Sequence, residues 1–141
     1  MMFGFLIIIL FVVWYKNSTK KDPIELEYLN YLNNMGDKNF FCYNNKLSLK
    51  KYVEENIVPY LPEQVEIIYL NGKTPESDYP EVVISKMLYG LKLYDGYPHL
   101  IKIRSGVTTE ISINNDVFNC INQHKDINPI LFKIYTFFDL G

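Results

Sequence analysis

The sequence predicts a small α+β domain, with a mixed sheet and flanking helices, behind a single N-terminal transmembrane helix. Three observations lead to this fold class. The 141 residues suffice for one domain. The segment over residues 1–15 carries no charge, and the remainder alternates between segments of helical period and segments of strand period. We therefore expect an anchor over 1–15, a tether over 16–21 and one folded domain over 22–141.

The N-terminal run is apolar on every helical face, because each residue from 5 to 15 is large and hydrophobic. Fifteen helical residues extend roughly 22 Å, and snorkelling lysines with local thinning can make up the difference to a bilayer core of ~30 Å. Positive charges follow at Lys16, Lys20 and Lys21. The positive-inside rule then places the domain on the cytosolic or organellar matrix side of a membrane that the chain crosses once. The lipid bilayer is thus a predicted partner.

Two other interpretations of this run stay open. A cleaved signal peptide would have a basic start and a small-residue cleavage site, and neither is present in residues 1–21. A buried core helix would show a polar face, which residues 5–15 lack. An uncleaved signal-anchor explains the run best.

Composition excludes several classes of function. The formal net charge is −2, with no long basic run, so we expect no nucleic-acid partner. Two cysteines cannot form a disulfide framework, and the isolated His99 and His124 have no metal-ligand spacing. We expect neither a metal nor a cofactor. Residues with A/T-rich codons are abundant (16 Ile, 14 Asn, 13 Lys) and alanine is absent, which indicates an AT-rich genome such as that of a large DNA virus or an organelle.

The first element of the domain is predicted to be a helix. Asp22 offers an N-cap, Pro23 suits the first helical position and Glu25 the third. Gly36 is a natural stop. A buried strand is expected next, over residues 39–43.

A second helix, a second strand and a loop follow. We expect Ser48 to cap the helix and Pro59 to end it. Residues 64–70 are rich in β-branched and aromatic residues and predict a strand, with a turn at Asn71-Gly72. Residues 73–80 predict a polar loop.

The last third of the domain is predicted to hold a hairpin between helices. Residues 81–89 fit either a strand or a helix, and their helical spacing favours the helix. Residues 99–104 and 107–113 alternate as two hairpin strands. A helix is expected from Asn114 and another over 128–138. We expect this last helix to pack on the domain; the alternative is an exposed apolar patch for a partner or a membrane surface.

The stretch Leu91-Lys92-Leu93-Tyr94-Asp95-Gly96-Tyr97-Pro98-His99-Leu100-Ile101-Lys102-Ile103-Arg104-Ser105-Gly106 resembles the cis-proline segment of the thioredoxin superfamily. There, a short helix leads into Gly-aromatic-Pro, an apolar strand, a tight glycine turn, a second strand and a final helix. Residues 39–70 are similar to the family's strand-helix-strand unit, and the resemblance covers roughly residues 22–125. It implies a thioredoxin-like sandwich.

The resemblance also implies a site. The bond between Tyr97 and Pro98 should be cis, and the backbone from Tyr97 to His99 should offer a peptide-binding edge. The strand that starts at His99 should run antiparallel to the strand that holds Ile67. Tyr97, Pro98 and His99 are therefore the predicted binding residues.

The chain departs from the family at the junction of the first strand and the next helix. The family's redox enzymes carry Cys-x-x-Cys there, whereas residues 43–48 hold no cysteine. This predicts a non-catalytic structural or interaction component of a membrane assembly, viral or organellar, with protein partners. The alternative is a membrane-tethered thiol-disulfide oxidoreductase that uses Cys42 as a degenerate monothiol site. A Cys42–Cys120 bridge stays open, and packing in the core is the simpler role for each cysteine.

Overall fold

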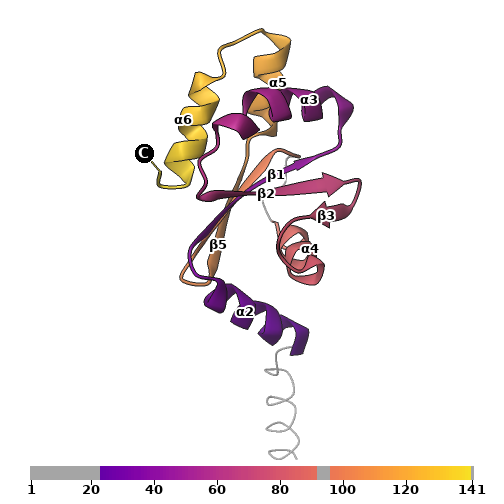
Figure 1. Cartoon of the computed structure of the whole chain (residues 1–141), viewed down its shortest axis with the longest axis vertical. Coiled ribbons are helices and arrows are strands. Elements are labelled where there is room, and N and C mark those ends of the chain that lie inside the picture. Colours follow the sequence, from indigo (N-terminus) through magenta and orange to yellow (C-terminus); the bar gives the residue numbers. More distant parts are fainter. Residues whose placement is uncertain (1–22, 92–95, 141) are drawn as a thin grey trace, which may run out of the picture.

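A mixed β-sheet lies between two layers of helices in the computed structural model, which describes residues 23–91 and 96–140 (Figure 1). The strands are β1 (Lys38–Asn44), β2 (Val65–Asn71), β3 (Thr74–Glu76), β4 (His99–Arg104) and β5 (Val107–Ser112). The helices are α2 (Pro23–Met35), α3 (Leu47–Asn56), α4 (Glu81–Tyr89), α5 (Asn114–Asn122) and α6 (Asn128–Phe137), with a short 3₁₀ turn, η1 (Val58–Tyr60). The order of the five strands in the sheet is β3-β2-β1-β4-β5.

Strand β1 has a parallel neighbour on one side and an antiparallel neighbour on the other. Phe41 lies opposite Ile67 of β2 in the parallel pair and opposite Leu100 of β4 in the antiparallel pair. The parallel pair is the expected outcome of a β-α-β unit. It follows that β4 runs antiparallel to the strand that holds Ile67, as predicted, although β1 lies between them.

The core has two halves, one on each face of the sheet, because successive side chains of a strand point to opposite faces. Helices α2 and α4 cover one face, where the buried residues are Leu32, Phe40, Cys42, Ile68, Ile84, Met87, Ile101 and Ile103. Helices α3, α5 and α6 cover the other face (Figure 1). Its buried residues are Phe41, Tyr43, Leu49, Val53, Ile57, Val65, Leu100, Ile113, Val117, Cys120, Ile130, Ile134 and Phe138.

The transmembrane part of the predicted fold class is wrong for the described residues. No helix within residues 23–91 and 96–140 is long and apolar enough to cross a bilayer. The expected anchor over 1–15 and tether over 16–21 lie outside the described residues. The fold class is therefore corrected to a small α/β domain with a five-stranded mixed sheet.

Two local predictions are also wrong. Helix α3 begins at Leu47 after Lys46, so Ser48 lies inside its first turn and does not cap it. The expected polar loop contains the three-residue strand β3, whose Pro75 lies opposite Leu70. Proline is tolerated there because β3 is an edge strand that pairs on one side only.

The two ambiguous segments are resolved. Residues 81–89 form helix α4, as favoured, because Ile84 and Met87 on one helical face are buried against the sheet. The apolar C-terminal segment packs on the domain as α6, as expected, with Ile130 and Ile134 buried. Its Phe132 remains 73% exposed, since it points away from the sheet.

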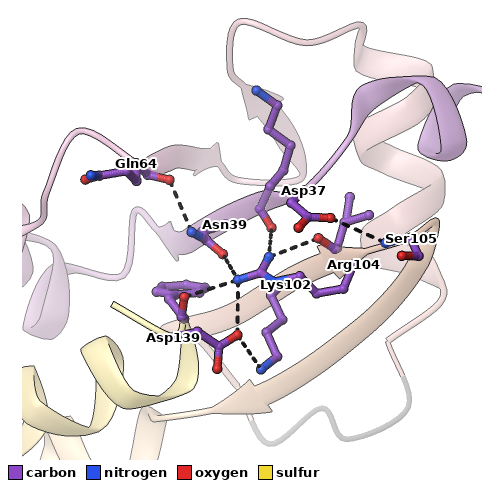
Figure 2. Close-up of polar contacts among 10 residues, drawn as sticks. Asp37, Asn39, Gln64, Lys102, Arg104, Ser105 and Asp139 are labelled. Atoms are coloured by element: carbon purple, nitrogen blue, oxygen red, sulfur yellow. Dashed lines mark hydrogen bonds and ion pairs between the residues drawn. The ribbon is translucent and has the colours of Figure 1, made fainter. Parts of the chain in front are cut away.

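The end of the sheet at the start of β1 is held by Arg104 (Figure 2). One guanidinium nitrogen donates to the carbonyls of Lys38, at 3.2 Å, and Ile103, at 2.9 Å. The other donates to the Asn39 side-chain oxygen at 2.8 Å and to the Phe138 carbonyl at 3.1 Å. The Phe138 carbonyl is at the end of α6, where helix carbonyls have no intrahelical partner. Arg104 thus joins β1, β4 and the end of α6.

We expect Arg104→Lys to lower the free energy of unfolding by about 1–3 kcal/mol, because an ammonium cannot donate to several acceptors held in a plane and leaves part-buried carbonyls without a donor. Urea denaturation of the full chain measures the change. Lys133→Gln is the control, since it removes an ion pair with Asp116 in which both side chains are 42% exposed; such a pair contributes less than about 1 kcal/mol. Equal losses in the two variants would contradict the role given to Arg104.

Candidate functional site

A groove of about 340 Å³ lies where the parallel strands β1 and β2 end, which is the end of the sheet opposite to Arg104. Its walls come from the ends of these strands, the β2–β3 hairpin, α4 and Tyr97, which lies two residues before β4. The lining residues are Asn44, Leu70, Gly72, Lys73, Pro75, Ser85, Leu88, Tyr89 and Tyr97. Ligands of α/β proteins are commonly bound at the carboxyl ends of parallel strands, and the volume lies within the range of small binding pockets.

Each wall is positioned by the core beneath it. Gly72 adopts a φ of +65° in the turn between β2 and β3, which folds β3 back beside β2. Ile84 and Met87 anchor α4 on the sheet. As a result Ser85, Leu88 and Tyr89 of α4 border the groove, and the Tyr89 side chain is 89% exposed.

Of the predicted binding residues, the structure brings only Tyr97 to the groove. The Tyr97–Pro98 bond is cis, as predicted. Pro98 is buried beneath, and its carbonyl accepts a hydrogen bond from the Ile113 amide at 3.0 Å. His99 is fully buried inside the sheet and lies opposite Cys42 in the β1–β4 ladder. A peptide in the groove can thus contact the Tyr97 side chain but has no access to that of His99.

The buried side chain of His99 makes a polar contact with Glu110. Its Nε2 lies 3.6 Å from a carboxylate oxygen of Glu110 on β5, and the Glu110 side chain is 15% exposed. The Tyr97 and His99 rings lie edge to face with centroids 6.4 Å apart. His99, the first residue of β4, therefore contacts β5 through Glu110 and packs against the ring of Tyr97. Its role is to position Tyr97.

The turn before Pro98 is tied to the junction of β5 and α5. The Gly96 carbonyl accepts a hydrogen bond from the Ser112 hydroxyl at 2.8 Å. Gly96 has a φ of +103°, and a Cβ atom there would lie 3.0 Å from the side-chain amide of Asn114. Only glycine adopts this conformation at low cost. The position of Tyr97 in the groove therefore depends on Gly96.

We expect Gly96→Ala to destabilise the domain by about 1–3 kcal/mol, the typical range for a side chain forced into a left-handed backbone region. Thermal or urea unfolding measures the loss. Gly36→Ala is the control, since Gly36 has a φ of +77° but open space around its Cβ position. A Gly96 variant no less stable than the Gly36 variant would show that the Asn114 contact contributes nothing.

Neither cysteine lines the groove. Cys42 is fully buried on the α2 and α4 face, and burial raises the pKa of its thiol far above the usual range. Cys120 is buried on the opposite face, with its sulfur 3.2 Å from the Tyr52 hydroxyl. Both cysteines are free, and the sheet separates them. A thiolate is the nucleophile in disulfide exchange, so the geometry gives Cys42 no means of attacking a substrate.

We expect neither thiol to react with an aromatic disulfide reagent in the native protein at neutral pH, and two thiols to react after denaturation. Release of the coloured leaving group measures the number of accessible thiols. Cys42→Ser should lower the free energy of unfolding by about 1–3 kcal/mol, because it places a hydroxyl in an apolar pocket. Rapid reaction of one native thiol that disappears in Cys42→Ser would favour the oxidoreductase alternative.

At the junction of β1 and α3, redox enzymes of the thioredoxin superfamily carry Cys-x-x-Cys. This chain has two hydrogen-bonded asparagines there, Asn44 and Asn45. The Asn44 side-chain oxygen accepts from the Lys46 amide at 3.3 Å, and the Asn45 amide donates to the Leu70 carbonyl at 3.1 Å. Leu47, the first residue of α3, is 93% exposed. This junction offers hydrogen-bonding groups and an exposed apolar side chain.

Sequence reasoning missed most residues of the groove. The sequence predicts only a polar loop at Lys73 and Pro75 and a helix at Ser85 and Tyr89, and gives none of the four a binding role. The available signal was the β-α-β unit itself, because its parallel strands end at a common edge where a binding site is expected. Among the described residues, no group of three or more histidine, cysteine or acidic side chains is placed to hold a metal ion.

Comparison of the chain with protein-family models, curated proteins and solved structures found no match. The resemblance to the thioredoxin superfamily therefore stays a proposal that rests on the residues of this chain.

Proposed function

We propose that the domain is a non-catalytic, thioredoxin-like interaction module that binds an extended segment of a partner protein in the groove beside Tyr97. The observation that carries the proposal is an open groove at the carboxyl ends of β1 and β2 whose strand–helix junction, residues 43–48, has no cysteine. The membrane assembly expected from the sequence is not part of the proposal.

The arrangement of the sheet supports the thioredoxin-like assignment. The unit β1-α3-β2 supplies a parallel pair, and the hairpin β4-β5 joins β1 in antiparallel orientation. Helices cover both faces (Figure 1). This is the mixed sandwich that the resemblance implies. The chain adds the edge strand β3, which extends the sheet beside β2 and forms one wall of the groove.

The chemistry of the groove supports binding of a peptide. Tyr89 and Tyr97 offer aromatic faces with a polar end, which suits interfaces that are partly wet. Asn44 and Ser85 offer donors and acceptors to a peptide backbone, and Lys73 offers one positive charge. The exposed Leu47 lies three positions after Asn44, at the start of α3. The residues that line the groove thus combine aromatic side chains with a polar surround, as protein-binding sites do.

The test is selection of peptides from a random display library on the full chain, followed by fluorescence anisotropy with the selected peptides. We expect Tyr97→Ala to weaken binding by about 2 kcal/mol, or roughly thirtyfold in Kd, as for a tyrosine anchor at an interface. Phe132→Ala is the matched control, since Phe132 is a 73% exposed aromatic residue on α6 at the other face of the sheet. Circular dichroism confirms that both variants are folded.

The competing results are distinct. Peptides that bind both variants equally well would place the binding surface elsewhere on the domain. Peptides lost only with Phe132→Ala would assign binding to the α6 face. A selection without enrichment would contradict the proposal that the groove binds extended peptides.

A further inference from the structure

The two edges of the sheet differ in how they are protected. Strand β3 has three residues, one of them a proline. Strand β5 has six residues, Val-Thr-Thr-Glu-Ile-Ser, without proline, lysine or arginine. Natural proteins protect exposed edges with short strands, prolines and charged side chains, lysine above all, because an unprotected edge can pair with another chain. Glu110 is the one charged residue of β5. Over residues 23–91 and 96–140 the strand order ends at β5, so no described strand pairs with its outer side.

We propose that β5 pairs in antiparallel orientation with β5 of a second copy of this chain, joining the two sheets into one. This dimer surface is separate from the groove. Strand β5 is rich in β-branched residues, which favour pairing, and Val107 and Thr109 are exposed where an adjacent strand would cover them.

The turn before β5 determines which of its backbone groups point outward. Ser105 and Gly106, with φ values of 51° and 75°, form a two-residue turn that pairs Arg104 with Val107. In such a turn the flanking pair is hydrogen-bonded, and hydrogen-bonded pairs alternate along the ladder. Val107 and Thr109 therefore direct their amide and carbonyl groups toward β4, whereas Thr108 directs its own toward the edge of the sheet.

One register makes β5 complementary to itself. With Thr109 at the two-fold axis, Val107 of each copy lies opposite Ile111 of the other, and the two Thr109 residues lie opposite each other. Pairs of β-branched residues and of threonines stabilise such ladders. Glu110, the only charged residue of β5, then lies opposite Thr108. A register centred on Glu110 would place two carboxylates face to face, which is destabilising.

The same register specifies an outcome for cysteine crosslinking. The two Thr109 residues would form a non-hydrogen-bonded pair with Cα atoms about 4.5 Å apart, within the range that a disulfide spans. The two Thr108 residues would lie diagonally, at about 7–8 Å, which is beyond that range. The native cysteines are buried and do not compete.

We expect the full chain with Thr109→Cys to form a disulfide-linked dimer under mild oxidation, read on a non-reducing gel, and the Thr108→Cys chain to stay monomeric on that gel. Thr108 is the matched control because it is an exposed neighbour in the same strand. Absence of a linked dimer with Thr109→Cys, or equal linkage in both variants, overturns the proposal.

A second variant tests the dimer without crosslinking. Thr109→Lys places two ammonium groups opposite each other, so we expect it to lower the dimer fraction in sedimentation of the full chain. Thr74→Lys places the same charge on the exposed edge strand β3 and should leave that fraction unchanged. A dimer fraction that responds to neither variant, or to both equally, would show that the copies associate through another surface.

Discussion

Strand β1 is buried on both faces and paired along both edges, and the rest of the domain is arranged around it. Its residues from Asn39 to Tyr43 are all buried, with alternate side chains in the two halves of the core. A strand of this kind needs helices on both faces of its sheet, as in α/β proteins. It also needs a neighbour at each edge, and β2 and β4 supply these. Because Cys42 is part of this strand, its sulfur lies in the core and is unavailable for chemistry.

The two ends of β1 have different roles as a result. At the amino end, hydrogen bonds of Arg104 join β1, β4 and the end of α6 (Figure 2). At the carboxyl end, the chain turns away into α3 and leaves the groove between the β2–β3 hairpin, α4 and Tyr97. The hydrogen bonds of Arg104 tie the strands together at the amino end. Side chains at the other end can contact a partner while the strands that carry them stay fixed, which is the usual arrangement of a binding site on a rigid scaffold.

The edges of the sheet show a similar division. Strand β3 is short and carries Pro75, so this edge is closed to pairing and serves instead as a wall of the groove. Strand β5 is longer and has no proline, lysine or arginine. On the face of the sheet that α2 and α4 cover, Glu110 of β5 contacts His99. Recognition of a peptide and self-association would thus use separate parts of one sheet.

Much of the fold could be predicted from the sequence because its signals are local. Periodicity identified the strands β1 and β2 and the hairpin of β4 and β5, and the helical spacing of residues 81–89 outweighed their β-branched composition. Tyr97 was identified through a motif of adjacent residues. The predicted cap at Ser48 is wrong because α3 begins one residue earlier, at Leu47, with Lys46 at the cap position and no side-chain cap. Strand β3 was missed because three residues give too short a pattern.

The sequence by itself determined the elements and their order, since backbone propensity and burial period act over a few neighbouring residues. Tertiary structure decided which strand lies beside which, that His99 and Cys42 face each other in the core, and that Tyr89 shares a groove with Tyr97. It also decided the role of Arg104, whose acceptors on Asn39 and Phe138 lie 65 and 34 positions away in the chain. Such contacts depend on how whole elements pack, and no local pattern of residues records that packing.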